Sequence, residues 1–549
     1  MMRKYKFFGK EISGPFTIPS GIITTETSVL EKIANEISEI GILTTKSIGP
    51  KPRQGNKEPI IAEYSHALFS FINAVGLTNP GAEEFAERLS KIKIPKDRFL
   101  LISIFGSNEN EFREVAEKLY KFADGFELNI SCPHSDKYGQ VVGQDKNLVE
   151  KIVKNVSSLG KPLLVKISPN LEIKETIISA IKAGAQGFTA INTKGPELFL
   201  YDGYSVLSNK VGGISGKAIL EIGLRCVKEI REITDLPIIA CGGISIAEDI
   251  RQYKQAGADF FGIGSALARM TTEEIKNYFH ELSLDLEKGT NNAARFLSKS
   301  LNAQYKKFRI RKNKKLAEDL FILELDTEIK IEPGQFIFAW LPEKGEKPFS
   351  VFDDEPLTLL VQKRGCFTDE LSKLKEGDFL YTRGPYGNSP KINGKILLVS
   401  GGTGIAGLYL FAKRNKETVA VLGAKDKNHL PYIEKFKKLC KEIYLTTENG
   451  EIGHKGLATD NLEEIIKKVK PEYCINCGPE CMTKDASQKE LKYINPEKIY
   501  SSIEFLTKCG IGLCGSCATS KGYRSCVDGT FFKFDQTAPH SKENIFLSN

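Results

Sequence analysis

The chain has 549 residues, more than a single hydrophobic core usually organises, because cores stop growing at roughly 250 to 300 residues. Hydrophobic residues make up 41% and charged residues 27%, which excludes a mainly disordered or collagen-like chain. Lys and Arg outnumber Asp and Glu by only 77 to 69, and no apolar run reaches the length of a signal-peptide core or a membrane span. We therefore expect a cytoplasmic enzyme of two or three domains that acts on small anionic molecules, without nucleic-acid or membrane partners.

Short apolar runs alternate with charged, helical-looking stretches from the N-terminus to about residue 290. This alternation predicts parallel strands joined by crossover helices. Eight such units predict an α/β fold, a (β/α)8 TIM barrel over residues 1–290, with ligands at the C-terminal ends of its strands. The runs are FTIPSG (16–21), ILTTKS (42–47), LLISIFG (100–106), FELNIS (126–131), LLVKIS (163–168), GFTAIN (187–192), PIIACGG (237–243) and FFGIGS (260–265).

Glycines and polar residues follow several of these runs. The pairs at 242–243 and 264–265 follow the seventh and eighth runs, where such barrels commonly bind a phosphate, and a flavin mononucleotide (FMN) fits there. Lys46 and Lys166 end other strands, and a buried charge needs a partner, so we favour a ligand role over surface lysines. Turn-like strand ends also carry amide side chains that suit a planar ring such as a pyrimidine, namely Asn73, Asn129 and Asn192.

The fourth run continues into SCPHSDKYGQ, which places Cys132 at a strand end, before a polar loop that contains a glycine. A cysteine is either a small buried hydrophobe or a reactive thiol, and a neighbouring cation or helix terminus lowers its pKa. The residues alone leave both interpretations open.

Basic residues accumulate and apolar content falls between residues 285 and 316, so we place a linker at 291–304. We interpret these basic residues as a solvated connector rather than a partner-docking strip. Short alternating segments then predict a small antiparallel β-barrel over 305–390. They are FILELDTEI, QFIFAWL, LTLLVQK and DFLYTRG.

A strand, a glycine turn and a helix are predicted by KILLVSGGTGIAGLYLFAKR, which opens an α/β domain over 391–500. The turn SGGTGIAG, residues 400–407, presents backbone amides where a nucleotide phosphate can bind at a helix N-terminus. Glycines after a strand are often only a turn, so this motif is weak by itself.

Cysteines crowd the last segment, 501–549. Four of them have the spacing C-x4-C-x2-C-x8-C, which resembles the plant-type 2Fe-2S arrangement, whereas zinc sites favour paired C-x2-C spacings. We interpret CGP at 477–479 as a tight turn after a strand, without a metal. The predicted cluster ligands are Cys509, Cys514, Cys517 and Cys526.

The layout of the second half resembles ferredoxin-reductase-like flavoproteins, which have a small β-barrel and an α/β nucleotide-binding domain, here with a 2Fe-2S segment. KPFS at 347–350 and GCFT at 365–368 resemble the segments of that family that hold FAD. GPYGN at 384–388 resembles the turn that follows them, and CGP the turn on the NAD side.

The first half resembles the NAD-linked dihydroorotate dehydrogenase family through TTKS, NAVGLTNPG, LNISCP, VKISPN, INT, GGISGKA and CGGIS, in that order. Residues from about 305 onward resemble the separate electron-transfer subunit of that enzyme, so the chain looks like a fusion of the two. The resemblance implies oxidation of dihydroorotate to orotate in pyrimidine biosynthesis. It also implies that electrons pass from FMN through the cluster and FAD to NAD, and that the barrels form a homodimer.

The resemblance also implies site residues, with Cys132 as the catalytic base. Substrate would contact Lys46, Asn73, Gly76, Leu77, Asn129, Asn192 and Thr193. FMN would contact Ser20, Lys46, Ser47, Asn129, Lys166, Ile191, Gly216, Gly242, Gly243, Gly264 and Ser265. FAD would contact Lys347, Pro348, Phe349, Ser350, Gly365 and Thr368, and the nucleotide turn would use Gly401, Gly402 and Gly404.

Some residues depart from the family pattern. His134 stands where asparagine is common, and SCPH also occurs in dihydropyrimidine dehydrogenases, which keeps that activity as an alternative. Ser103 replaces an asparagine near FMN, Lys347 replaces an arginine near FAD, and Gly407 replaces a proline. A second alternative is an electron-transfer flavoprotein that uses the barrel as a docking scaffold.

Overall fold

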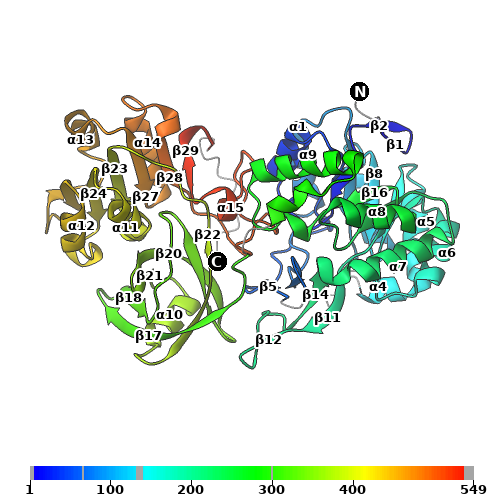
Figure 1. Cartoon of the computed structure of the whole chain (residues 1–549), viewed down its shortest axis with the longest axis horizontal. Helices are drawn as coiled ribbons and strands as arrows, with labels where there is room; N and C mark the ends of the chain where they lie inside the picture. Colours follow the sequence, from blue (N-terminus) through cyan, green and yellow to red (C-terminus); the bar gives the residue numbers. More distant parts are fainter. Residues whose placement is uncertain (1–4, 65–66, 131–139, 298–300, 537–549) are drawn as a thin grey trace. The chain divides into compact units, whose positions relative to one another are not determined.

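The computed structural model describes residues 5–64, 67–130, 140–297 and 301–536. The chain divides into two compact units. The first comprises Met1–Leu301 with Ile511–Ala518, and the second comprises Asn302–Gly510 with Thr519–Asn549; Figure 1 labels their elements. Within the described ranges, no helix is both long and apolar enough to cross a membrane.

The first unit is built on a closed barrel of parallel strands, and all eight predicted runs form it. Their side chains are almost all buried, which is expected of parallel strands covered by helices. The predicted TIM barrel is therefore confirmed. In barrel order the strands are β3 (Phe16–Ile18), β4 (Ile40–Thr44), β7 (Phe99–Ile104), β8 (Gly125–Asn129), β9 (Leu163–Ile167), β10 (Gly187–Ala190), β15 (Ile238–Cys241) and β16 (Phe260–Gly262).

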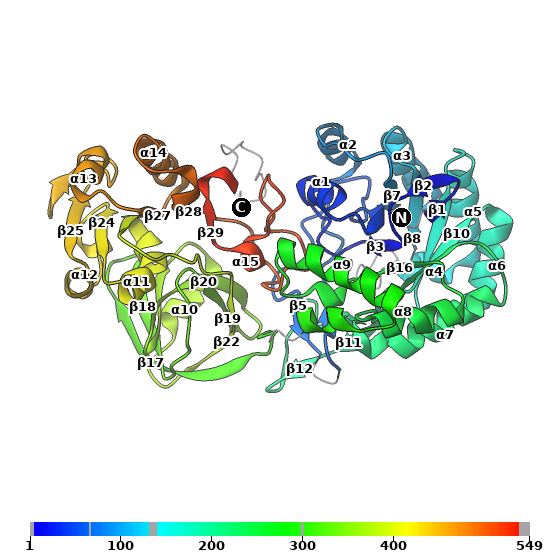
Figure 2. The same ribbon diagram turned by 45° about the horizontal axis from the view of Figure 1, so that its top comes forward.

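Amphipathic helices cover the barrel, and Figure 2 shows α5 to α8 outside its strands. Helix α5 buries Val149, Ile152, Val153 and Val156, a spacing that gives one apolar face, and the Asp145 side chain caps its first turn. The helices are α1 (Thr27–Glu36), α2 (Ala82–Ser90), α3 (Glu109–Leu119), α4 (Gln140–Gln144), α5 (Lys146–Ser157), α6 (Ile173–Ala183), α7 (Leu220–Arg231), α8 (Ala247–Ala256) and α9 (Thr272–Lys288).

Additional strands flank the two ends of the barrel. The hairpin of β1 (Tyr5–Phe7) and β2 (Lys10–Ile12) places the Phe7 ring edge-on against Phe99 and Phe260, with centroids 4.8 Å apart in both pairs. A four-stranded sheet in the order β11-β14-β6-β5 carries residues near the opposite, C-terminal ends of the barrel strands. These strands are β5 (Ile61–Glu63), β6 (Phe71–Asn73), β11 (Lys194–Leu198) and β14 (Val211–Ser215), and a small hairpin pairs β12 (Leu200–Tyr201) with β13 (Tyr204–Ser205).

The second unit contains a closed antiparallel barrel in the order β17-β18-β21-β20-β19-β22, as predicted, with α10 (Cys366–Lys373) beside it. The interpretation of the basic residues of 285–316 as a solvated connector was wrong for residues 306–315, which form β17 within the range predicted for the β-barrel. Its charges obscured the strand, because lysines line its outer face while Ile310 is buried and both edges are paired. The strands are β17 (Lys306–Lys315), β18 (Leu320–Leu325), β19 (Phe336–Leu341), β20 (Gly345–Asp354), β21 (Leu357–Gln362) and β22 (Phe379–Tyr386).

The predicted α/β region follows as a seven-stranded sheet in the order β26-β25-β24-β23-β27-β28-β29, covered by helices. Its last strand comes from the cysteine-rich segment and pairs antiparallel with β28. The strands are β23 (Ile396–Gly401), β24 (Thr418–Ala424), β25 (Glu442–Thr447), β26 (His454–Lys455), β27 (Tyr473–Cys477), β28 (Ile499–Ser502) and β29 (Phe531–Lys533). The helices are α11 (Ile405–Arg414), α12 (Ile433–Leu439), α13 (Leu462–Val469), α14 (Glu480–Glu490) and α15 (Ser525–Asp528).

Candidate active site

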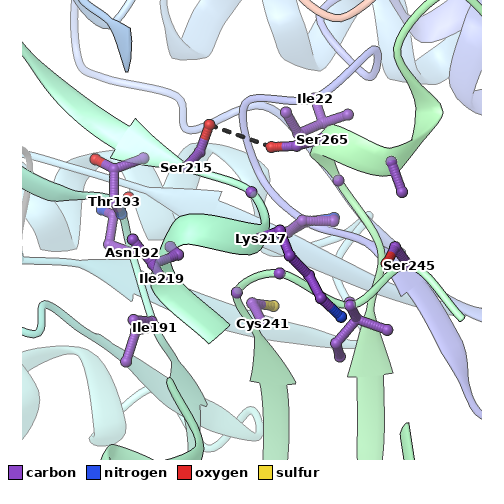
Figure 3. Close-up of a pocket in the computed structure, with 18 of the residues that line it drawn as sticks. Ile22, Ile191, Asn192, Thr193, Ser215, Lys217, Ile219, Cys241, Ser245 and Ser265 are labelled. Atoms are coloured by element: carbon purple, nitrogen blue, oxygen red, sulfur yellow. Dashed lines mark hydrogen bonds between the residues drawn. The ribbon is translucent and has the colours of Figure 1, made fainter. Parts of the chain in front are cut away.

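A cavity that is open to solvent lies at the C-terminal ends of β3, β9, β10, β15 and β16, beside the end of β14 (Figure 3). Ligand sites of (β/α)8 barrels lie at these strand ends. The cavity brings together many residues that the sequence had proposed. They are Ser20, Lys166, Ile191, Asn192, Thr193, Gly216, Gly242, Gly243, Gly264 and Ser265.

Part of the cavity wall is bare backbone. Gly216 has φ +89°, and a Cβ added to it would lie 1.9 Å from the carbonyl oxygen of Phe69. Gly243 has φ +76°, and its added Cβ would lie 2.8 Å from the Cβ of Leu220. Only glycine satisfies both the left-handed backbone and the lack of space, so these two positions of the wall must remain without a side chain. Two hydroxyl groups of the lining also contact each other, since the Ser265 hydroxyl donates a hydrogen bond to the Ser215 hydroxyl at 3.1 Å (Figure 3).

Hydroxyl and amide side chains connect the strand ends. The hydroxyl of Ser47 lies 2.7 Å from that of Ser20 and 3.0 Å from that of Ser103. Asn129 donates to Ser47 at 2.9 Å, and Asn192 donates to the Asn129 side-chain oxygen at 3.4 Å. Ser103, which replaces a family asparagine, is therefore part of the same network. These bonds fix the orientation of the amides that face the cavity region.

Both predicted lysines are buried rather than on the surface. Lys46 is 5% exposed and Lys166 is 4% exposed. Lys166 lines the cavity, whereas Lys46 is not one of the lining residues. Their burial excludes the interpretation of both residues as surface lysines.

Three proposed substrate residues lie on the neighbouring four-stranded sheet and the loop after it, outside the cavity lining. Asn73 ends β6, and its amide donates to the Gly213 carbonyl oxygen at 3.2 Å. Gly76 and Leu77 follow in the left-handed backbone region, with φ of +82° and +55°. Cys132 and His134 lie outside the described residues, as does the loop before α4, so the base remains a prediction.

Sequence reasoning missed several residues that line the cavity, and two of them carry ionisable side chains, Lys217 and Cys241. Lys217 forms an ion pair with Asp249, whose carboxylate also accepts hydrogen bonds from the amide and hydroxyl of Ser245 at 2.8 and 2.9 Å. Burial raises the pKa of the Cys241 thiol to about 12, so this thiol is neutral and a poor base. Lys217 belongs to the motif GGISGKA and Cys241 to CGGIS, and only glycines of these motifs were predicted to belong to the site.

In the second unit, the proposed FAD segment Lys347–Ser350 lies on β20, paired with Phe336–Ala339 of β19. The ring of Phe349 stacks on Phe367 at 6.3 Å. Gly365 precedes α10, and the Thr368 hydroxyl accepts hydrogen bonds from the amides of Arg364 and Gly365 at 2.9 and 3.2 Å. Thr368 therefore caps its own helix, so any contact of its hydroxyl with a pyrophosphate would have to compete with these bonds.

The glycine turn after β23 is closely packed. A Cβ on Gly404 would lie 2.0 Å from the carbonyl oxygen of Cys477, and one on Gly407 would lie 2.9 Å from its sulfur. Gly402 has φ +55°, and α11 begins at Ile405. At position 407, where proline is common in the family, any side chain would require the Cys477 side chain to shift.

All four predicted cluster cysteines are buried, and the chain between the first three turns at Gly510, Gly512 and Gly515, with φ of +77°, +76° and +72°. Within the first unit, Thr25 donates to the Cys514 carbonyl oxygen at 2.7 Å. Within the second unit, Arg383 donates to the Cys509 carbonyl oxygen at 2.7 Å. The described residues nevertheless include no group of three or more His, Cys, Asp or Glu side chains arranged to hold a metal ion.

A closed (β/α)8 barrel with a cavity at the C-terminal ends of its strands, lined by glycines and a buried lysine, defines the first unit as a TIM-barrel domain with the site geometry of barrel enzymes. Residues 2–283 match the dihydroorotate dehydrogenase family, and the chain belongs to that family.

Two archaeal relatives, both named dihydroorotate dehydrogenase B (NAD(+)), catalytic subunit, resemble the first half. The protein from Methanocaldococcus jannaschii is 38% identical over 299 residues, which cover 52% of this chain and 96% of that protein. The protein from Pyrococcus abyssi is 40% identical over 290 residues, which cover 51% of this chain and 95% of that protein. A chain in a solved structure of an NADH-dependent reduced ferredoxin-NADP oxidoreductase is 34% identical, covers 42% of this chain and 89% of its own length, and has a TM-score of 0.39.

Proposed function

We propose that this protein oxidises (S)-dihydroorotate to orotate in pyrimidine biosynthesis and delivers the electrons to NAD. Membership of the dihydroorotate dehydrogenase family supports the reaction. The observation that carries the proposal is the cavity itself, in which a bare glycine wall, a buried lysine and oriented amides meet at one end of the barrel. FMN bound there would accept the hydride.

The residues of the cavity suit the cofactor. Gly216 and Gly243 line the cavity as main chain without side chains, where a phosphate would bind backbone amides, and Ser265 adds a hydroxyl to the lining. Lys166 would stabilise negative charge on the flavin ring, as a donor in an oxyanion hole does.

Asn129 and Asn192 are held by hydrogen bonds, so they can orient the amide groups of a pyrimidine ring without losing conformational freedom on binding. Cys132 would remove the proton from C5 of the substrate, on the face opposite the flavin, because a thiolate is accessible near neutral pH. Its place directly after the strand that carries Asn129 supports this role.

In the second unit, we assign FAD to the face of β20 and the start of α10, and NAD to the turn after β23. For the 2Fe-2S cluster, the spacing and burial of the four cysteines support the proposal, and we derive no step through it. We further propose a cytoplasmic enzyme that forms homodimers through its barrel.

The test is anaerobic reduction of the purified full chain by dihydroorotate, dihydrouracil or NADH, followed by the loss of flavin absorbance, with iron analysis alongside. We expect bound FMN that is bleached by dihydroorotate and by NADH. Bleaching by dihydrouracil alone would favour a dihydropyrimidine dehydrogenase. Bleaching by NADH alone would favour an electron-transfer flavoprotein.

A further inference from the structure

A buried carboxylate lies inside the barrel beneath the cavity. Glu127 of β8 is 1% exposed, and its Oε1 atom has no hydrogen-bond partner among the described residues. Side chains alternate along a strand, so Glu127 points to the same side as Asn129 two residues later. The barrel interior is that side, because Glu127 is in register with Leu164, which belongs to the apolar cluster inside the barrel.

Lys166 occupies the layer above Glu127. It is in register with Asn129 of β8 and with Thr189 of β10, and it reaches the cavity lining. Both charged side chains are nearly inaccessible to water, where an isolated charge is costly and the attraction of opposite charges is strong. The stacking of these layers places a negative charge below the positive charge that faces the cavity.

Both charges act on the same cavity-lining group. Burial is the main cause of the raised pKa of the Cys241 thiol, and in addition the charge of Lys166 lowers this pKa whereas the charge of Glu127 raises it. The thiol thus responds to the two residues with opposite sign. A flavin ring against the same wall would respond in the same way.

We propose that Glu127 is a positioning residue for Lys166: its carboxylate is the fixed counter-charge that directs the ammonium group toward the cavity and limits the positive charge acting on the flavin. This inference rests on the proposed function, because the flavin is its cofactor. Positive charge stabilises reduced flavin, so Glu127 keeps the flavin less oxidising than Lys166 alone would make it. A flavin that is less oxidising passes its electrons more readily to the next acceptor.

The substitution Glu127→Gln tests the proposal, because it removes the charge and keeps the size of the side chain. We expect the FMN midpoint potential of the full chain to rise, so that the ratio of reduced to oxidised flavin at a fixed ambient potential increases at least tenfold. Thr189→Val is the matched control. Thr189 is also buried in register with Lys166, and its hydroxyl also lacks a partner in the described structure, but it carries no charge, so the potential should stay constant.

Spectroelectrochemical titration of the wild type and both variants gives the result directly. An unchanged or lower potential in a Glu127→Gln protein that still binds FMN overturns the role of Glu127, while the proposed function stands. Wild-type protein that binds no FMN contradicts the proposed function instead. If Glu127→Gln does not fold, Glu127→Asp withdraws the carboxylate by one methylene and should raise the potential less, and a constant potential would then count against the proposal.

Discussion

Glu490 is a buried acid whose ionisation should weaken the second unit. It lies at the end of α14 with no exposed surface, accepts a hydrogen bond from Asn476 at 2.8 Å through Oε2, and has no partner in the described structure for Oε1. Burial raises the pKa of this carboxyl from 4.5 to about 7, although hydrogen bonds from Asn476 and Cys474 oppose the rise. We predict that Glu490→Gln, which cannot ionise, becomes progressively more stable than the wild type as pH increases.

The size and sign of this effect follow from linkage. The pKa of Glu490 is higher in the folded than in the unfolded state, so its stabilising contribution is complete below pH 4.5 and is lost as pH rises through about 7. A rise from 4.5 to about 7 corresponds to about 3 kcal/mol, at about 1.4 kcal/mol per pH unit. The stability difference between Glu490→Gln and the wild type should therefore grow by about that amount between pH 4.5 and 8.

Urea unfolding of the full chain at several pH values measures this difference, with hydrogen exchange of the β27 amides reporting on the second unit. Glu464→Gln is the control, because Glu464 is exposed on α13 and its replacement should leave the pH dependence unchanged. Parallel stability curves for the wild type and Glu490→Gln would refute the reasoning.

Three further predictions concern other sites. Cys132→Ser should retain flavin but slow its reduction by dihydroorotate by roughly 10² to 10⁴, measured by stopped flow, because an alcohol is a poorer base than a thiol. Gly216→Ala should weaken FMN binding by about 1 to 3 kcal/mol in a fluorescence titration, because the added Cβ would collide with the Phe69 carbonyl oxygen. Gly203→Ala is the control and should leave FMN binding unchanged. Gly203 also has a positive φ, but no atom of the described residues lies within 4 Å of its added Cβ. Glu346→Gln should destabilise the second unit by about 3 to 5 kcal/mol in thermal unfolding, because it leaves the buried Arg383 guanidinium, 2.6 Å from the Glu346 carboxylate, without its counter-ion.

Each of these three has a result that contradicts it. Undiminished flavin reduction in Cys132→Ser removes the thiol from the proton transfer. Equal FMN affinity in the two glycine variants would show that the bare wall does not contact the cofactor. A Glu346→Gln protein as stable as the wild type would mean that the buried ion pair contributes nothing net.

The sequence by itself determined the local elements of both halves. Apolar runs that end in polar residues marked all eight barrel strands, because a strand covered on both faces must be apolar almost throughout. The glycine pair at 242–243 marked part of the cavity wall, because glycine adopts a positive φ readily, and at Gly243 an added Cβ would also collide with Leu220. These signals depend only on residues that are close together in the chain, so they can be recognised from the sequence alone.

Only the tertiary structure decided which distant residues meet. Strand β17 was not recognised from the sequence, because most of its residues are exposed lysines and arginines. Strand β29 joins a sheet whose other strands end nearly 30 residues earlier in the chain. The pairing of Lys217 with Asp249, and the layer of Glu127 below Lys166, depend on the register between separate strands and helices. Such contacts form because closing the barrel and the sheet brings these side chains together, and no periodicity along the chain encodes that closure.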